Sequence, residues 1–374
     1  MKAQTPALPG RPVPAWSLCR QGLVAACVAT LLAACGGSGD DDTEEDRRDD
    51  PQPAATSQMQ AVLDEMAALG AKPVETLTTA QARAQPSVAD AVRSLLVKQG
   101  RSTAPEAVGS VEDRTIPGPA GNPLAIRIYK PAGTGPFPSM LYIHGGGWVI
   151  ATIDTYDASA RALTNAAGAI VVSIEYRKGP ENRYPAAHDD TYAGWQWLVA
   201  NAVSIGGTQR QIAVVGESAG GNMAASIALR ARDAGIQQPV HQGLVYPITD
   251  STLDKPSHEQ NRNAMPLSTA SVAWFADRYL ATPADGLDPR FAVLRAPDVR
   301  GVAPATVINA DIDPLRSEGR YYVEKLRAAG VDAEWNLYGG VTHEFFGTGA
   351  VVDEGRQAVA RMAERLKASY AAAR

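Results

Sequence analysis

The sequence predicts a three-layer α/β fold, in which helices cover both faces of a mostly parallel central sheet. Short apolar runs rich in β-branched residues alternate with segments whose apolar residues recur at helical spacing. Strands that are apolar on both faces are typical of parallel sheets with helices on each side. The 374 residues are 45% hydrophobic and 20% charged, a balance typical of a globular protein.

The elements follow from local patterns in chain order. Two amphipathic helices are expected at 59–71 and 88–100, and a glycine closes each of them. Alternating apolar and polar residues predict a half-buried strand at 122–131. Buried strands and intervening helices are then expected over 139–146, 169–176, 191–202, 211–218, 222–235, 242–247 and 305–311. We therefore assign residues 58–374 to one domain without internal repeats.

Residues 249–282 interrupt this alternation with a polar loop and a helix. They follow the strand at 242–247, and ligands bind at the carboxyl ends of strands in open α/β sheets. We expect a helical cap over a site, built from about 58–105 and 249–282. An insertion that merely decorates the surface is the alternative.

Charge and cysteine content exclude several classes of function. The net charge is −5, and the run 40–50 alone carries −6 from eight acids and two arginines. The remainder is close to neutral, which argues against nucleic-acid binding. The three cysteines are Cys19, Cys27 and Cys35, so the domain contains neither a disulfide nor a cysteine nucleophile. No metal-ligand spacing is visible, and no cofactor is expected.

The amino terminus has the pattern of an export signal. Basic residues precede the short apolar stretch 22–35, whose end, Leu-Ala-Ala-Cys35, resembles the bacterial lipobox. We interpret 1–34 as a lipoprotein signal peptide, Cys35 as the lipidation site and 35–57 as a flexible acidic tether. The implied location is the periplasmic side of a bacterial membrane. Gly36, rather than an aspartate, follows Cys35, and this favours the outer membrane. A plain secretory signal is the alternative.

The stretch "VVGESAGG" places Ser218 between glycines, after a strand and before a helix. This is the context that a Gly-x-Ser-x-Gly nucleophile elbow requires. The flanking glycines let strand and helix pass closely, while a strained backbone holds the serine in the open. We therefore expect Ser218 to be a nucleophile, which needs a base and an oriented acid.

The base is sought among the histidines that follow Ser218. His241 belongs to the entry of a strand, and His258, in the polar insertion, is expected to be exposed to solvent. His343 lies in a glycine-containing loop after the strand-like run 333–338, which makes it the best candidate. His144 precedes the serine, and we expect it to shape its loop.

The acid is sought at the end of the strand run 305–311. Asp311 and Asp313 both lie there, and the residues alone leave the choice open. Pro314 keeps Asp313 out of the helical region, but capping of the next helix would explain either aspartate.

Three glycines follow the strand at 139–146, in "YIHGGGWV". Such a run is costly in backbone entropy and is explained if backbone N–H groups must face an oxyanion. A phosphate-binding loop is the competing interpretation, but its Gly-Lys-Ser/Thr ending and the Gly-x-Gly-x-x-Gly pattern are both absent.

These motifs together resemble the hormone-sensitive-lipase-like family of α/β-hydrolases, the bacterial family IV esterases. The matching segments are His144-Gly-Gly-Gly-Trp148, Gly216-Glu-Ser-Ala-Gly220, Asp313-Pro-Leu-Arg316, His343 and the run 175–187. The resemblance implies the α/β-hydrolase fold and a triad of Ser218, Asp313 and His343. It also implies that Gly146, Gly147 and Ala219 supply the oxyanion hole, and that the substrates are esters of short-to-medium acyl chains.

Three departures from the family pattern lie outside the triad. Glu217 precedes the serine, Glu175 replaces an aspartate, and Lys178-Gly179 replaces Leu-Ala. Each could alter the pocket or its hydrogen bonds.

The predicted partners are a small ester and, through Cys35, a membrane; the oligomeric state stays open. The candidate pocket walls are Trp148, Trp274, Phe275 and Tyr279, although packing in the core or cap would explain each of them equally well. Two other functions compete with ester hydrolysis: a catalytically silent binding lipoprotein, and an acyltransferase or peptidase that uses the same serine.

Overall fold

The computed structural model describes residues 53–373. The predicted signal peptide, Cys35 and most of the predicted tether therefore lie outside the described residues. Within 53–373, no helix is both long and apolar enough to cross a bilayer. Thr56, which we predicted to belong to the tether, donates its N–H to Gly340 O at 2.8 Å, and the first helix begins at Ser57.

The described chain forms an eight-stranded sheet with the order β1-β2-β4-β3-β5-β6-β7-β8. β2 is antiparallel to β1 and β4, and the pairs from β4 onward are parallel. The strands are β1 (Ser110–Pro117), β2 (Pro123–Lys130), β3 (Phe137–Ile143), β4 (Ile170–Ile174), β5 (Gly207–Glu217), β6 (Gln242–Val245), β7 (Ala305–Ile312) and β8 (Ala333–Thr342). The mostly parallel sheet is thus confirmed.

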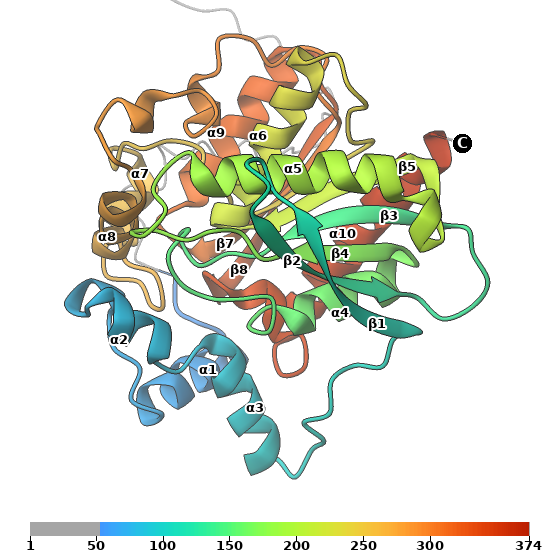
Figure 1. The fold of residues 1–374 in the computed structure, drawn as a ribbon. Coiled ribbons are helices and arrows are strands. Elements are labelled where there is room, and N and C mark those ends of the chain that lie inside the picture. Colours follow the sequence, from blue (N-terminus) through green and yellow to red (C-terminus); the bar gives the residue numbers. More distant parts are fainter. Residues whose placement is uncertain (1–52, 374) are drawn as a thin grey trace, which may run out of the picture. The chain divides into compact units, whose positions relative to one another are not determined.

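Helices cover both faces of this sheet, as predicted (Figure 1). One face packs into a core with α4 (Asp157–Ala167) and α10 (Asp353–Ala372). The other packs against α5 (Ala186–Asn201), α6 (Ala219–Asp233) and α9 (Arg316–Ala328). β4 and β6 are buried along their whole length because both of their faces are covered.

The cap combines two segments that are far apart in the sequence. The first holds α1 (Ser57–Ala68), the short turn Val74–Thr76, α2 (Thr79–Ala84) and α3 (Val88–Lys98). The second holds α7 (Pro256–Gln260) and α8 (Thr269–Tyr279). They are joined where Ser271 Oγ donates to Glu75 at 2.7 Å and Trp274 Nε1 donates to Leu77 O at 3.2 Å. Figure 1 shows α2 beside α8.

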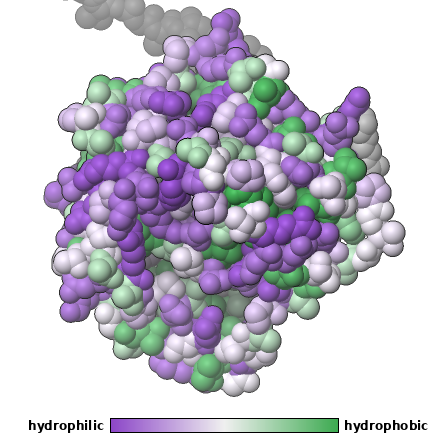
Figure 2. Space-filling view, viewed as in Figure 1, coloured by the Kyte–Doolittle hydropathy of each residue, from purple (hydrophilic) through white to green (hydrophobic). Residues whose placement is uncertain are grey.

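Side-chain caps fix where these helices begin. Ser87 and Ser268 each accept, through the side chain, a hydrogen bond from the backbone N–H three residues on, and each donates its own backbone N–H to the side chain of that residue, which makes capping boxes at α3 and α8. The face of the molecule shown in Figure 2 is rich in hydrophilic side chains, with apolar groups scattered among them.

Candidate active site

Ser218 occupies a sharp turn between β5 and α6. Its backbone has φ 56° and ψ −116°, a region that costs a non-glycine residue conformational energy. The Ser218 N–H donates to Val245 O on the neighbouring strand at 2.8 Å, which holds the turn in place. The strand–turn–helix context predicted from the sequence is therefore present, and the strained residue is the serine itself.

The glycines around Ser218 are required by close backbone approach. A Cβ on Gly216 would lie 2.2 Å from Gly220 O, and a Cβ on Gly220 would lie 2.0 Å from Ile143 O. Both contacts are with backbone atoms, which cannot move aside as a flexible side chain would. The steric explanation offered for the Gly-x-Ser-x-Gly motif holds at both positions.

Ser218, His343 and Asp313 form a continuous hydrogen-bonded chain. His343 Nε2 lies 3.0 Å from Ser218 Oγ, and His343 Nδ1 lies 2.7 Å from Asp313 Oδ2. Because a carboxylate only accepts, Nδ1 carries the proton and Nε2 is free to accept the serine proton. Asp313 is fully buried, and its other oxygen accepts from Leu315 N at 2.8 Å.

The electrostatic environment of the hydrogen-bonded residues Ser218, His343 and Asp313 favours the protonated, charged form of the His343 imidazole. Burial by itself lowers the pKa of His343, but the charge and hydrogen bond of Asp313 outweigh it, so that the net pKa is raised above its ordinary value. Tyr246 packs its ring over His343 with the centroids 4.4 Å apart. The imidazole is thus held on one side by a carboxylate and on another by an aromatic ring.

Asp311, the rival acid, has a different partner. Its Oδ1 receives an ion-paired hydrogen bond from Arg316 at 2.8 Å. His241 is buried at the start of β6, between Thr306 Oγ1 at 2.9 Å and Ser369 Oγ at 3.0 Å, as its place at a strand entry predicted. Neither residue joins the triad.

The glycine loop lies beside Ser218 with its backbone strongly turned. Gly146 has φ 96° and Gly147 has φ 56°, conformations that favour glycine. Val149 N and Ile150 N both donate to Gly146 O, at 3.0 and 2.9 Å. Within 53–373, the N–H groups of Gly146, Gly147 and Ala219 donate to no protein acceptor, so they remain available to an oxyanion.

Residues that the sequence did not single out fasten this loop. Tyr176 OH lies 3.1 Å from His144 O and 2.9 Å from Gly145 O. Arg83, from the cap helix α2, donates to Val149 O at 2.9 Å and to Gly179 O at 2.7 Å. A lone arginine in the segment between the two predicted amphipathic helices gives no signal of such a contact, because its acceptors are backbone carbonyls distant in the sequence.

His144 shapes the loop, as predicted. It is fully buried, its Nδ1–H donates to Gly145 O at 2.8 Å, and its ring stacks on Tyr176 with the centroids 4.4 Å apart. Burial and the charge of Lys178 lower the pKa of His144 to about 3, which keeps the ring neutral. It is therefore unsuited to binding a proton during turnover.

The three departures from the family pattern have structural partners. Glu175 accepts from Ile153 N at 3.0 Å and pairs with Lys178, so it fastens the chain beyond the glycine loop. Gly179 passes so close to α8 that a Cβ would lie 2.7 Å from Arg278 O. Glu217 is buried, and its two oxygens accept from Tyr142 OH and Tyr246 OH. Burial raises the pKa of Glu217 to about 7.

A cavity of about 230 Å³ contains Ser218, His343, Gly146 and Gly147. The cap closes it with apolar side chains, of which the larger are Met66, Val74, Met265, Leu267, Val272 and Phe275. The Phe275 ring packs directly on Gly147, where a Cβ would lie 2.2 Å from it. Of the four predicted wall residues, Phe275 is the one that the structure places at this cavity.

The other three predicted wall residues do not line this cavity. Trp148 and Tyr279 are buried and stack on each other with ring centroids 4.9 Å apart. Trp274 faces Leu77 O and lies under Arg278, whose guanidinium carbon is 3.7 Å from the ring centroid. Their wide apolar surfaces are buried against one another and against the cap, as the packing alternative proposed.

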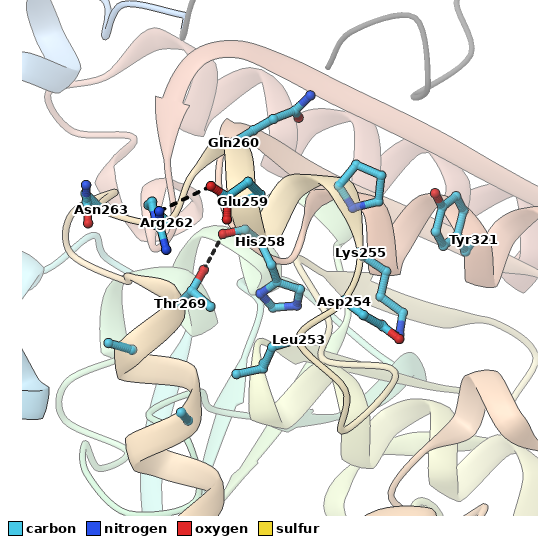
Figure 3. A pocket seen from close by; sticks show the side chains of 13 residues that line it. Leu253, Asp254, Lys255, His258, Glu259, Gln260, Arg262, Asn263, Thr269 and Tyr321 are labelled. Carbon is cyan, nitrogen blue, oxygen red and sulfur yellow. Dashed lines mark hydrogen bonds and ion pairs between the residues drawn. The ribbon is translucent and has the colours of Figure 1, made fainter. Parts of the chain in front are cut away.

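His258 is also misplaced by the sequence prediction. It is 2% exposed rather than open to solvent, and its Nε2–H donates to the buried carboxylate of Glu318 at 2.9 Å. Its ring borders a separate hollow of about 1160 Å³ between α7, α8 and α9 (Figure 3). The insertion is polar because its side chains bind α9, which composition alone cannot distinguish from solvent exposure.

The chain is similar in sequence to known hydrolases. A family model described as the alpha/beta hydrolase fold matches residues 140–347. An ethyl acetate hydrolase of Pseudomonas putida is 33% identical over 261 residues, covering 69% of this chain and 82% of that protein. A carboxylesterase of Mycobacterium tuberculosis is 38% identical over 265 residues, with the same coverage of 69% and 82%.

Solved structures give the same result. A hyperthermophilic esterase from Pyrobaculum calidifontis superposes with a TM-score of 0.76 at 35% identity, covering 84% of this chain and 98% of that chain. A thermostable esterase from Pseudomonas putida superposes with a TM-score of 0.77 at 31% identity, covering 85% and 98%.

Proposed function

This chain belongs to the α/β-hydrolase family and is a carboxylic-ester hydrolase, and we propose that Ser218, His343 and Asp313 are its catalytic triad. The observation that carries this assignment is the hydrogen-bonded chain from Ser218 Oγ through His343 to Asp313, with distances of 3.0 and 2.7 Å. It opens onto a cavity that also holds the glycine loop.

The reaction proceeds by two acyl transfers. Ser218 Oγ attacks the ester carbonyl while His343 Nε2 takes its proton, and Asp313 stabilises the resulting imidazolium. The tetrahedral oxyanion is bound by the N–H groups of Gly146, Gly147 and Ala219. A single donor of this kind is worth roughly 10²–10³ in turnover.

Collapse of this intermediate breaks the bond to the alcohol. His343 gives its proton to the departing alcohol oxygen, which leaves Ser218 esterified by the acyl group. Water then attacks the acyl-enzyme, His343 takes a proton from it, and collapse returns that proton to Ser218 as the carboxylic acid is released.

The cavity limits the acyl group. About 230 Å³, closed by Phe275 and other apolar side chains of the cap, accommodates a short-to-medium chain. Ligand pockets of this kind are apolar with a few placed polar groups, which here are the triad and the glycine loop.

Hydrolysis of p-nitrophenyl esters of increasing acyl length tests this function. We expect kcat/KM to peak at short chains and Ser218→Ala to reduce kcat by roughly 10⁴ or more while leaving the thermal unfolding transition in place. Equal turnover in the Ser218→Ala variant would refute the triad assignment. Absence of turnover in the wild type would favour a binding protein, and product formation only with an added acceptor alcohol would favour an acyltransferase.

We also propose that the enzyme is exported and lipid-anchored through Cys35, on a tether that follows a signal peptide at 1–34. The basic start, the apolar stretch and the Leu-Ala-Ala-Cys35 sequence support this proposal. Expression in a bacterial host with radiolabelled palmitate, followed by membrane fractionation, tests it. Labelled protein in the membrane pellet is expected, and a Cys35→Ser variant that labels and sediments equally would contradict it.

A further inference from the structure

A second cavity, of about 750 Å³, borders the catalytic cavity. α3, the segment 101–106, α4 and α10 form its walls. Val88, Thr155 and Glu344 line both cavities, so the two spaces meet at these side chains. The mechanism described above assigns no role to this larger space.

Glu344 stands at the junction in an unusual conformation. It directly follows His343 and has φ 72°, a left-handed conformation that favours glycine. Non-glycine residues in such strained conformations cluster at functional sites, which points to a use for the Glu344 side chain. Tyr156 OH donates to Glu344 Oε1 at 2.7 Å and fixes the carboxylate. Within 53–373, Glu344 Oε2 accepts no hydrogen bond.

The surroundings of Glu344 favour a ligand that donates a hydrogen bond. Glu217 also lines the second cavity, next to the buried Ser159. Two arginines of the cavity walls are engaged, since Arg161 pairs with Asp157 and Arg356 pairs with Asp353. The two others, Arg93 and Arg101, are exposed.

The chemistry of ester cleavage decides which part of the substrate lies near Glu344. The carbonyl oxygen must face Gly146 and Gly147, whereas the leaving oxygen must face His343 Nε2, which protonates it. The alcohol part therefore extends past His343, toward Glu344 and the larger cavity. The acyl part is left with the smaller cavity under Phe275.

We propose that the second cavity binds the alcohol part of the ester and that Glu344 accepts a hydrogen bond from it. The inference rests on the proposed function and deepens it. The substrate class is a short-chain acyl ester of a larger alcohol that carries a donor, either a hydroxyl or a protonated amine. Glu344 is then a specificity-determining residue, because a site built to pair with a donor rejects the analogue that lacks it.

Matched pairs of acetate esters test this proposal on the purified full chain. 3-(Dimethylamino)propyl acetate is compared with 4-methylpentyl acetate, and 4-hydroxybutyl acetate is compared with pentyl acetate. Each pair has nearly the same shape and differs in one donor group. We expect kcat/KM at pH 7.5 to favour the donor by roughly tenfold or more in at least one pair. The pair that shows the preference identifies the donor as ammonium or hydroxyl.

Two variants locate that preference. Glu344→Gly removes the carboxylate without adding backbone strain, and we expect the ratio within each pair to fall to about one. Glu344→Gln keeps an acceptor but loses the charge, so it should lower an ammonium preference more than a hydroxyl preference. Glu324→Gln, at an exposed glutamate of α9, is the matched control and should leave both ratios unchanged.

A third variant tests the cavity itself. Ala162→Phe narrows it from the α4 side and should lower the ratio of kcat/KM for the preferred large ester over methyl acetate. Wild-type ratios near one in both pairs, or a donor preference that survives in Glu344→Gly, would overturn the inference while ester hydrolysis still stood. Failure of the wild type to hydrolyse any of these esters would instead count against the proposed function.

Discussion

The protein contains two buried pairs of histidine and carboxylate that look alike locally. In one, His343 Nδ1 lies 2.7 Å from Asp313; in the other, His258 Nε2 lies 2.9 Å from Glu318. The two acids are separated by four residues at the junction of β7 and α9, and each of the four residues in the two pairs is at most 3% exposed. Neither distance nor burial distinguishes them.

The second nitrogen of each ring makes the difference. His343 Nε2 faces Ser218 Oγ, whereas His258 Nδ1 has no hydrogen-bond partner within the described chain. Glu318 also accepts from Thr249 N at 2.6 Å and Asp250 N at 3.0 Å, which binds the start of the insertion to α9. An imidazole and a carboxylate therefore form part of the proposed triad in one place and dock the insertion in the other.

The largest expected effect comes from neutralising the acid of each pair. Asp313→Asn should lower kcat by roughly 10⁴, because the amide favours the wrong imidazole tautomer. Glu318→Gln should change kcat of the folded enzyme by much less. Steady-state kinetics on p-nitrophenyl butyrate checks both, and equal losses in the two variants would break the comparison.

The free energy of unfolding should show the opposite order, with the larger loss in the pair of His258 and Glu318. His258→Leu leaves the Glu318 carboxylate buried with backbone donors alone, and removing one partner of a buried pair costs about 3–5 kcal/mol in the free energy of unfolding. Both acids keep backbone donors, Glu318 from Thr249 N and Asp250 N and Asp313 from Leu315 N, so these donors do not set the order. His343→Leu should cost less, because active sites are commonly held in place at a cost in stability that replacing one of their residues relieves. Urea unfolding measures both; a smaller loss in His258→Leu than in His343→Leu would contradict the docking role.

Glu217 is a third buried carboxylate, and it sharpens the comparison because it accepts hydrogen bonds from tyrosines rather than from a histidine. Burial raises the pKa of Glu217 from 4.5 to about 7, so the folded state binds more protons than the unfolded state between these values. The contribution of Glu217 to the free energy of unfolding is fully present below pH 4.5 and is lost as pH rises through about 7. Glu217→Gln should therefore gain stability relative to wild type between pH 5 and pH 8 in urea unfolding; a constant difference would refute this.

The smallest expected effect concerns the pH–rate profile. The general base must be neutral, so kcat/KM should rise with pH through the pKa of His343, which lies above its ordinary value. The charge of Glu217 contributes to raising the pKa of His343. Glu217→Gln should therefore move the rising limb of the plot of kcat/KM against pH to lower pH, by a fraction of a pH unit. His258→Leu, which alters the other pair, should leave the limb in place. A shift toward higher pH in Glu217→Gln would contradict the prediction.

Short-range patterns in the sequence were sufficient for much of the fold and for the nucleophile. Buried strands and the glycine-flanked Ser218 were predictable from the sequence alone. Burial shows in the spacing and type of the apolar residues, and the turn at Ser218 shows in its neighbouring glycines. Helices α4 and α10 were not among the predicted elements, although the apolar positions of α10 recur at helical spacing. Strand β1 was also missed, since six of its eight residues are exposed and the strand carries no apolar run.

The sequence by itself determined the α/β architecture, the elbow at Ser218 and the glycine loop, because each depends on neighbouring residues. Only the tertiary structure decided which partners distant side chains meet. It paired Asp313 with His343 across 30 residues, buried His258 against Glu318, and moved Trp148 and Tyr279 from the pocket into the core. It also brought Glu344 to the junction of two cavities. Such contacts depend on how helices and strands pack against one another. The residues that are close in sequence to each of these side chains do not determine that packing.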